Sequence, residues 1–235
     1  MPELLSIIVP VYNEATTVQQ VIRRLLEIPL PVAREIVVVN DGSTDGTTEA
    51  LDEISPVPGV LSIVHAQANG GKGSAIRIGL QQARGTIIAI QDADLELDPI
   101  QLAGLVQPIV DREAEVVYGS RFLSGRPPGP WLSVTANRGL TLVTNMLFGA
   151  RLTDMETCYK IMRTPIARSL QLESNRFDIE PEITAKLLRQ RRRIVERPVR
   201  FDPRNRASGK KIRWRDGVQA IAVLLKYRFK FDKPP

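Results

Sequence analysis

The chain has 235 residues, of which 43% are hydrophobic and 25% charged, as expected for a soluble globular domain with an ample core. The single Cys158 excludes an internal disulfide and a multi-cysteine zinc site, and it fits a reducing compartment. The N-terminus lacks the basic and apolar segments of an export signal, and the apolar stretch at 220–225 is far shorter than the ~20 residues of a membrane span. We therefore expect a cytoplasmic chain.

Strand and helix patterns alternate along the first half of the chain. Apolar, β-branched runs predict strands at 4–11, 35–40, 60–66, 86–90 and 115–120. Helical spacing or start signals predict helices at 18–26, 44–54, 72–83 and from 99, with Thr44 or Asp45 as the cap of the second helix. Such alternation with short connections predicts a right-handed, mostly parallel sheet with helices on both faces.

The pattern loosens after residue 121. We expect a Gly/Pro-rich loop at 124–130, a helix at 134–148, a strand at 157–163 and a helix at 181–191. A strand at 193–199, a basic loop at 201–212 and a last helix from Trp214 should follow. No repeat or interdomain linker is visible. The fold class is therefore α/β, in a single domain.

Acidic side chains follow the strand predicted at 86–90: Asp92, Asp94 and Glu96. In an open α/β sheet, ligands bind beyond the carboxyl ends of the strands, which is where these carboxylates lie. Carboxylates brought together repel one another unless a cation lies between them, and hard oxygen ligands favour Mg²⁺ or Mn²⁺. The alternative interpretation is a solvated acidic turn.

Two common nucleotide-binding motifs are absent. Pro10-Val-Tyr-Asn-Glu14 stands where a nicotinamide-binding fold would carry G-x-G-x-x-G, and no G-x-x-x-x-G-K-[ST] occurs. The formal charge of +6 is concentrated in the segment 189–215. A run of this kind permits nucleic acid, a phosphorylated substrate or an anionic membrane as partner, although a solvated basic face is its commonest meaning.

A set of short motifs occurs in a fixed order: IVPVYNE at 8–14, VVNDGSTD at 38–45, NGGKG at 69–73, QDADLE at 91–96 and GSR at 119–121. Together they resemble glycosyltransferase family 2, the inverting sugar-transfer enzymes with the GT-A fold. Within this family the chain is most similar to the dolichol- or polyprenyl-phosphate mannose and glucose synthases. The resemblance covers nearly the whole chain. It implies a single GT-A domain over 1–235, with 1–121 binding nucleotide sugar and metal, 122–212 forming the acceptor side and a basic loop, and 213–235 forming an amphipathic basic helix and tail.

The resemblance implies roles on the donor side. The nucleobase and ribose would be held by Pro10, Tyr12, Asn13, Glu14 and Asp41. Lys72 would lie near the base or the phosphates, Asp92 would contact ribose or the metal shell, Asp94 would bind the metal and diphosphate, and Glu96 would be a further metal-side ligand. The metal would be Mg²⁺ or Mn²⁺. Ordinary alternatives are a turn-forming Asp41 and a surface lysine at a helix start for Lys72.

The resemblance implies that fixed cations hold phosphate: Arg121 would stabilise the departing nucleoside diphosphate, and Arg206 and Lys210 would bind donor or acceptor phosphate. Asp154, in DMETCYK at 154–160, would orient the acceptor, with general base as a lesser role and a helix cap or turn as the structural alternative. A lipid phosphate is already an anion at neutral pH and needs cations more than a base. A hydroxyl acceptor would need a base, and Asp154 or Glu156 would supply it.

The last helix places Trp214, Val218, Ile221, Ala222 and Leu225 on one face. Such a stripe more often packs on the core of the protein, and contact with an anionic membrane surface is the alternative. Any membrane contact would be peripheral, on the inner face.

We therefore predict a metal-dependent inverting glycosyltransferase that moves mannose or glucose from a GDP- or UDP-linked donor to polyprenyl or dolichyl phosphate. Transfer to a hydroxyl, with Asp154 or Glu156 as base, is the runner-up. A nucleotidyltransferase would want a glycine-rich, arginine-bearing loop after the first strand, which is missing. A basic nucleic-acid-binding domain is the non-enzymatic alternative, and it lacks aromatic residues in its densest part, 189–193.

Overall fold

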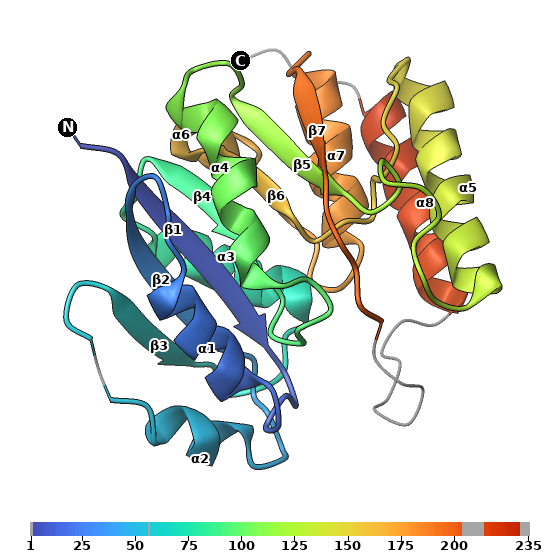
Figure 1. The fold of residues 1–235 in the computed structure, drawn as a ribbon. Helices are drawn as coiled ribbons and strands as arrows, with labels where there is room; N and C mark the ends of the chain where they lie inside the picture. Colours follow the sequence, from blue (N-terminus) through green and yellow to red (C-terminus); the bar gives the residue numbers. More distant parts are fainter. Residues whose placement is uncertain (1, 56, 204–213, 231–235) are drawn as a thin grey trace.

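A seven-stranded sheet with the order β3-β2-β1-β4-β6-β5-β7 forms the centre of the computed structural model, which describes residues 2–55, 57–203 and 214–230 (Figure 1). The strands are β1 (Leu4–Val11), β2 (Ala33–Asn40), β3 (Leu61–His65), β4 (Ile87–Ile90), β5 (Val116–Ser120), β6 (Lys160–Arg163) and β7 (Ile194–Pro198). The central strands β1, β2 and β4 are apolar runs buried along most of their length, as strands covered on both faces must be. The predicted α/β fold with a mostly parallel sheet is confirmed.

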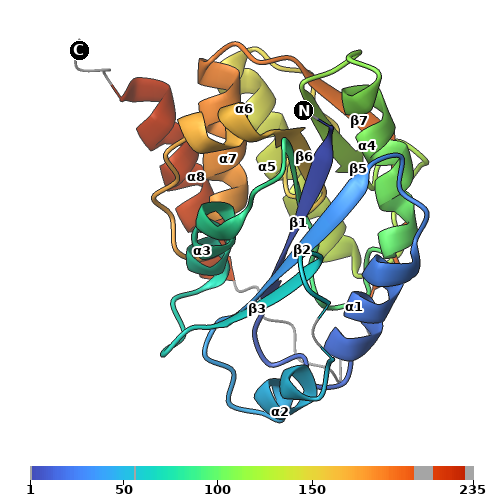
Figure 2. The ribbon, with the colours of Figure 1, turned by 90° about the vertical axis from the view of Figure 1, so that its left-hand side faces the viewer.

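Helices cover both faces of the sheet (Figure 2). They are α1 (Val18–Glu27), α2 (Thr47–Asp52), α3 (Lys72–Gln82), α4 (Leu102–Val110) after the 3-10 turn η1 (Pro99–Gln101), α5 (Trp131–Phe148), α6 (Thr164–Ser169), α7 (Ile179–Arg189) and α8 (Trp214–Phe229). Helices α1 and α4 lie on one face of the sheet, and α3, α6 and α7 lie on the other. In the described part of the chain, no helix combines the length and the hydropathy that crossing a bilayer demands.

Strand β6 is antiparallel to both of its neighbours, β4 and β5, whereas the other paired strands run parallel. Its amino end therefore lies at the edge of the sheet where the other strands have their carboxyl ends. This arrangement brings the segment before β6, which contains Asp154, to the same edge as the acids that follow β4. The candidate site therefore combines residues from the first half of the chain with residues that precede β6, a strand from the second half.

Two local expectations differ from the structure. The second helix begins at Thr47 with Gly46 at its N-cap position, so neither Thr44 nor Asp45 stands there. The Asp45 carboxylate does accept a hydrogen bond from the Thr47 backbone N–H at 3.1 Å, and this bond stabilises the turn that leads into the helix. The short helix α6 was not predicted, because its six residues are too few to show helical periodicity.

The expectation that the apolar stripe of the last helix packs on the core is wrong. Val218 is 58% exposed and Leu225 is 41% exposed. The face of α8 that packs against α5 and α7 carries Ala220, Val223, Leu224 and Tyr227 instead. These buried residues also recur at helical spacing, so the sequence contains two possible apolar faces for this helix. The Tyr227 hydroxyl fixes the buried face by donating a hydrogen bond to the Glu182 carboxylate at 2.9 Å. The side chain of Trp214 lies outside the described residues.

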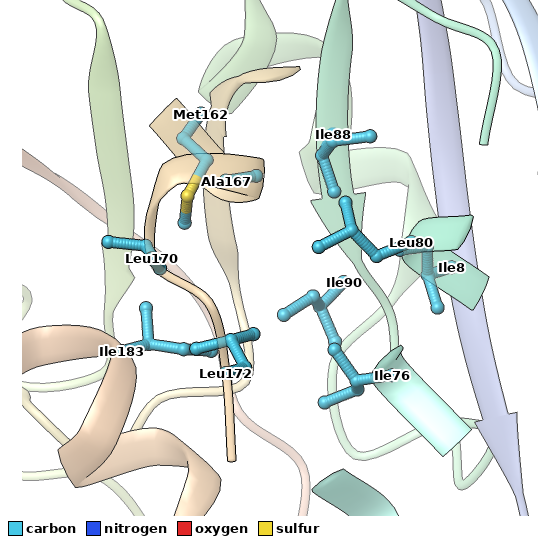
Figure 3. Close-up of a pocket in the computed structure, with 10 residues that line it drawn as sticks. All are labelled: Ile8, Ile76, Leu80, Ile88, Ile90, Met162, Ala167, Leu170, Leu172 and Ile183. Atoms are coloured by element: carbon cyan, nitrogen blue, oxygen red, sulfur yellow. The ribbon is translucent and has the colours of Figure 1, made fainter. Parts of the chain in front are cut away.

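A small cavity of about 20 Å³ lies inside the core between β4 and the α6–α7 region (Figure 3). Its lining is entirely apolar and includes Ile90, Leu170 and Ile183. A water molecule needs polar partners that this lining does not offer. The cavity is therefore a packing defect of the core and not a ligand site.

Candidate active site

Most of the predicted site residues in the described chain meet at the edge formed by the carboxyl ends of β1, β2, β4 and β5 and the amino end of β6 (Figure 1). Pro10 lies in β1 opposite Val39 of β2, and Tyr12 follows directly after β1. Arg206 and Lys210 fall outside the described residues.

The turns after β1 and β2 are tied together. Asn13 has a φ of 55°, in the left-handed region that Asn tolerates better than most residues. Its backbone N–H donates to Ser43 Oγ at 3.0 Å, and its side-chain oxygen accepts from the Thr44 N–H at 2.8 Å. The Glu14 N–H donates to Thr47 Oγ1 at 2.9 Å. These hydrogen bonds fix Asn13 and Glu14 to the turn before α2 and to its first residue, and we call the segment 12–14 the rim.

Asp41 holds the glycine-rich loop. Its carboxylate is 2% exposed and accepts from the backbone N–H groups of Gly70 and Gly71 at 2.9 and 2.7 Å, and from Asn69 Nδ2 at 3.0 Å. Burial raises the pKa of Asp41, while the hydrogen bonds from Gly70 and Gly71 oppose that rise. The structure gives Asp41 a place in the loop, and its contact with a nucleotide stays a prediction.

The glycines of this loop allow another segment of backbone to approach. A Cβ on Gly71, whose φ is +94°, would overlap the carbonyl oxygen of Asn175, and one on Gly73 would overlap that of Ser174. The Ser74 N–H donates to the Asn175 carbonyl oxygen at 3.1 Å. The motif therefore packs against residues about 100 positions later, a requirement that no local pattern reveals.

Lys72 lies at the start of α3 with its side chain 12% exposed. Its Nζ is 2.8 and 3.0 Å from the two Asp92 oxygens and 2.9 Å from Glu180 Oε1. Burial favours loss of the proton, but the negative charges, led by Asp92, outweigh burial and hold the pKa of Lys72 well above its ordinary value. Lys72 is thus a permanent cation beside Asp92, and the surface-lysine alternative is wrong.

Glu180, in the first turn of α7, joins Lys72 to the acceptor side. Its Oε2 lies 2.5 Å from Nζ of Lys160, a lysine with no exposed surface. The Lys160 ammonium also donates to the carbonyl oxygens of Met155, at 3.0 Å, and Thr157. Burial would raise the pKa of Glu180, but Lys160 and Lys72 outweigh it and lower that pKa. The sequence signal that was missed is a lysine within an apolar strand, because such a residue needs a buried anion.

The acids after β4 do not form a complete metal cage. Leu95 has a φ of 61°, which is strained for a bulky residue, and the Glu96 N–H donates to Asp94 Oδ1 at 3.1 Å. Among the residues described by the structure, no three His, Cys, Asp or Glu side chains gather closely enough to hold a metal ion. Mg²⁺ is usually held by one or two carboxylates together with substrate phosphates, so Asp94 fits an ion shared with a diphosphate, whereas both Asp92 oxygens already lie against the Lys72 ammonium. The metal assignment stays a prediction.

Arg121 and Asp154 form a buried, two-pronged ion pair. Arg121 Nε and Nη2 donate to the two Asp154 oxygens at 2.7 and 2.8 Å, and the Arg121 backbone N–H donates at 3.0 Å. Burial would lower the pKa of Arg121, but the hydrogen bonds and charge of Asp154 outweigh burial and raise it. The Phe201 ring lies 5.4 Å from the guanidinium. Both Asp154 oxygens are occupied, which disfavours this residue as a general base.

Glu196 of β7 supports this pair from behind. Its carboxylate accepts from the backbone N–H groups of Thr153, at 2.9 and 3.0 Å, and of Asp154, at 3.0 Å. Burial is the main reason that the pKa of Glu196 is raised. Sequence reasoning gave Glu196 no role, since the contact depends on β7 lying at the edge beside β5.

The sequence model described as Glycosyl transferase family 2 matches residues 6–170. The chain belongs to this family. It is a glycosyltransferase, and the family and enzyme class predicted from the motifs are confirmed.

Relatives of this glycosyltransferase include lipid-phosphate enzymes. It is 31% identical to the dodecaprenyl-phosphate galacturonate synthase of Rhizobium johnstonii over 74% of this chain and 52% of the relative, so it spans about half of that protein. It is 28% identical to the undecaprenyl-phosphate mannosyltransferase of Micrococcus luteus over 86% of this chain and 85% of the relative.

A solved structure confirms the fold. The glucosyl-3-phosphoglycerate synthase of Mycobacterium tuberculosis, in complex with Mn²⁺, UDP and phosphoglyceric acid, superposes with a TM-score of 0.74 at 18% identity, covering 98% of this chain and 80% of that chain. This likeness and the family match establish the GT-A fold.

Proposed function

We propose that this glycosyltransferase moves a hexose, mannose or glucose, from a GDP- or UDP-linked donor to a polyprenyl phosphate with inversion at the sugar carbon. The observation that carries the proposal is the Arg121–Asp154 pair, because Arg121 already takes up both oxygens of Asp154, the first candidate for the base that a hydroxyl acceptor would need. A phosphate acceptor is already a nucleophilic anion near neutral pH and needs positive charge around it. The names of the rhizobial and micrococcal relatives support the same class of acceptor.

The chain's own residues divide the work. On the donor side, the rim at 12–14 and the Asp41-bound glycine loop would hold the nucleoside, with the Lys72–Asp92 pair beside the diphosphate. A bound Mg²⁺ or Mn²⁺, held by Asp94 with Asp92 nearby, would supply positive charge to the departing nucleoside diphosphate. On the acceptor side, Arg206 and Lys210, which lie outside the described residues, would supply the net positive charge for the incoming phosphate, and Arg121, paired with Asp154, would donate a hydrogen bond to it.

Peripheral membrane contact belongs to the same proposal. Both α5 and α8, which pack side by side (Figure 1), carry exposed apolar side chains: Trp131 68%, Leu142 58%, Met146 68%, Val218 58%, Leu225 41% and Phe229 65%. We call this set the α5–α8 apolar face. Lys226 and Arg228 flank it on α8. An amphipathic surface with basic residues suits an anionic bilayer, where a polyprenyl phosphate is held.

The test measures release of nucleoside diphosphate from UDP- and GDP-sugars, with and without a short polyprenyl phosphate and with Mg²⁺ or Mn²⁺. We expect turnover with one donor, stimulated by the lipid phosphate and lost in Asp94→Ala. The matched control is Asp111→Ala, an exposed acid at the end of α4 that should behave like the wild type. Turnover with a hydroxyl acceptor in place of the lipid would overturn the acceptor, and absence of donor turnover would overturn the proposal as a whole.

A further inference from the structure

Glu156 carries a buried carboxylate oxygen that nothing accounts for. Its Oε1 is enclosed and has no hydrogen-bond partner in the described part of the chain. The residue lies in the segment between α5 and β6, two positions after Asp154. An enclosed acceptor without a donor is costly, so native structures seldom keep one without a reason.

The charged groups around Glu156 are already engaged with one another. They are Arg121 after β5, Asp154 in its own segment, Lys160 of β6 and Glu180 of α7. Arg121 neutralises Asp154 through two hydrogen bonds. An ammonium group has three donors, and those of Lys160 reach Met155, Thr157 and Glu180. Glu156 is therefore left without a cation of its own in this cluster.

Protonation removes the need for a cation beside Glu156. A carboxylate whose enclosed oxygen has no partner favours its neutral form, and burial raises the pKa of Glu156 to about 7, although Lys160 opposes the rise. A neutral carboxylic acid is an O–H donor, which an anionic ligand can use. A second carboxylate close to Asp154 would instead repel a phosphate.

We propose that Glu156, in its neutral form, is a second acceptor-recognition residue that donates a hydrogen bond to a phosphate oxygen of the acceptor beside the Arg121–Asp154 pair. This inference rests on the proposed phosphate acceptor. A hydroxyl acceptor would require the opposite state, because an ionised Glu156 would then take the proton from the attacking oxygen. The two roles therefore predict opposite effects of an amide at this position.

The experiment compares the wild type, Glu156→Gln and Glu156→Ala by kcat/KM for a short polyprenyl phosphate between pH 6 and pH 8.5. In the wild type, loss of the Glu156 proton should lower kcat/KM above pH 7 by about tenfold for each pH unit. The Gln amide keeps a donor at every pH, so this variant should stay within a few-fold of the wild type at pH 6 and lose the fall above pH 7. Glu156→Ala should raise the KM for the lipid roughly 10- to 100-fold.

Other outcomes overturn the inference. A Glu156→Gln variant as inactive as Glu156→Ala at every pH would assign an ionised carboxylate to this position. Equal behaviour of all three proteins would assign no role to Glu156. In both cases, turnover of the wild type with polyprenyl phosphate would leave the proposed function standing, whereas a wild type inert toward polyprenyl phosphate would remove both. Thermal unfolding at pH 5 and pH 8 checks folding independently, and the Gln variant should gain most over the wild type at pH 8.

Discussion

Arg121 and Asp154 face each other across the junction of β5 and β6, joined by hydrogen bonds of 2.7 and 2.8 Å, with no exposed surface on Asp154. Arg121 directly follows β5, and Asp154 lies in the segment before β6, which pairs antiparallel with β5. The pair thus fastens the two halves of the chain at the point where the proposed acceptor must bind. Its burial makes it strong in geometry and sensitive to loss of either partner.

Asp154→Ala should lower the free energy of unfolding by about 3–5 kcal/mol, because it leaves the Arg121 guanidinium buried without its anion. Urea denaturation measures the change. The control is Glu115→Ala, which removes an exposed ion pair with Arg192 at 3.1 Å and should cost less than about 1 kcal/mol. If the two variants lost equal stability, the buried Arg121–Asp154 pair would contribute no more to stability than the exposed Glu115–Arg192 pair.

Gly73→Ala should disturb the glycine loop. The new methyl group would overlap the backbone of Ser174, so backbone must shift, at a cost of about 1–3 kcal/mol. Because Lys72 is the neighbouring residue, affinity for the nucleotide sugar, measured by calorimetry, should fall as well. Gly104→Ala in α4 meets nothing within 4 Å and should instead stabilise the protein by about 0.5–1 kcal/mol. Unchanged stability and affinity in Gly73→Ala would contradict the packing role.

The same loop shows what local patterns contain and what they omit. The sequence displays the glycines, Lys72 and the acids after β4, and the strand ends place them at one edge of the sheet. Their partners Ser174, Asn175 and Glu180 lie about 100 residues away and follow no local period. Chain direction in β6 and the buried face of α8 were likewise set by tertiary packing, which overrides a short periodic signal. The family motifs narrowed the function further than periodicity alone could.

Glu35 lies near the amino end of β2, at the opposite end of the strands from the candidate site, and its pKa gives a pH-dependent prediction. Its carboxylate is 2% exposed and accepts from Ser6, from Arg84 Nε at 2.7 Å and from the Gly85 N–H at 3.1 Å. Burial alone would raise the pKa of Glu35, but these hydrogen bonds outweigh burial and lower it. The stabilisation is therefore complete above the ordinary value of 4.5 and disappears as pH falls through the lower folded-state pKa.

Glu35→Gln should accordingly lower the free energy of unfolding at pH 7 by about 2–3 kcal/mol, and its difference from the wild type should shrink as pH drops below 4.5. Urea denaturation across pH 3 to 7 follows both proteins. Turnover per folded molecule should remain close to that of the wild type, because Glu35 is remote from the candidate site. Glu27→Gln, at an exposed position in α1, should change stability by less than about 0.5 kcal/mol. A pH-independent loss in Glu35→Gln would contradict the assigned cause.

The α5–α8 apolar face should bind anionic vesicles through Leu225 and Phe229, which are 41% and 65% exposed. Changing both to Glu adds negative charge and removes apolar area, so vesicle binding should weaken roughly 10- to 100-fold in cosedimentation, while stability stays near that of the wild type because neither side chain is buried. Ile100→Glu is the matched control, since Ile100 is 51% exposed on η1, outside this face, and should leave binding intact. If the control lost as much vesicle binding as the Leu225/Phe229 variant, added charge and not this face would govern binding. If the wild type did not bind vesicles, this face would not be the surface that contacts the membrane.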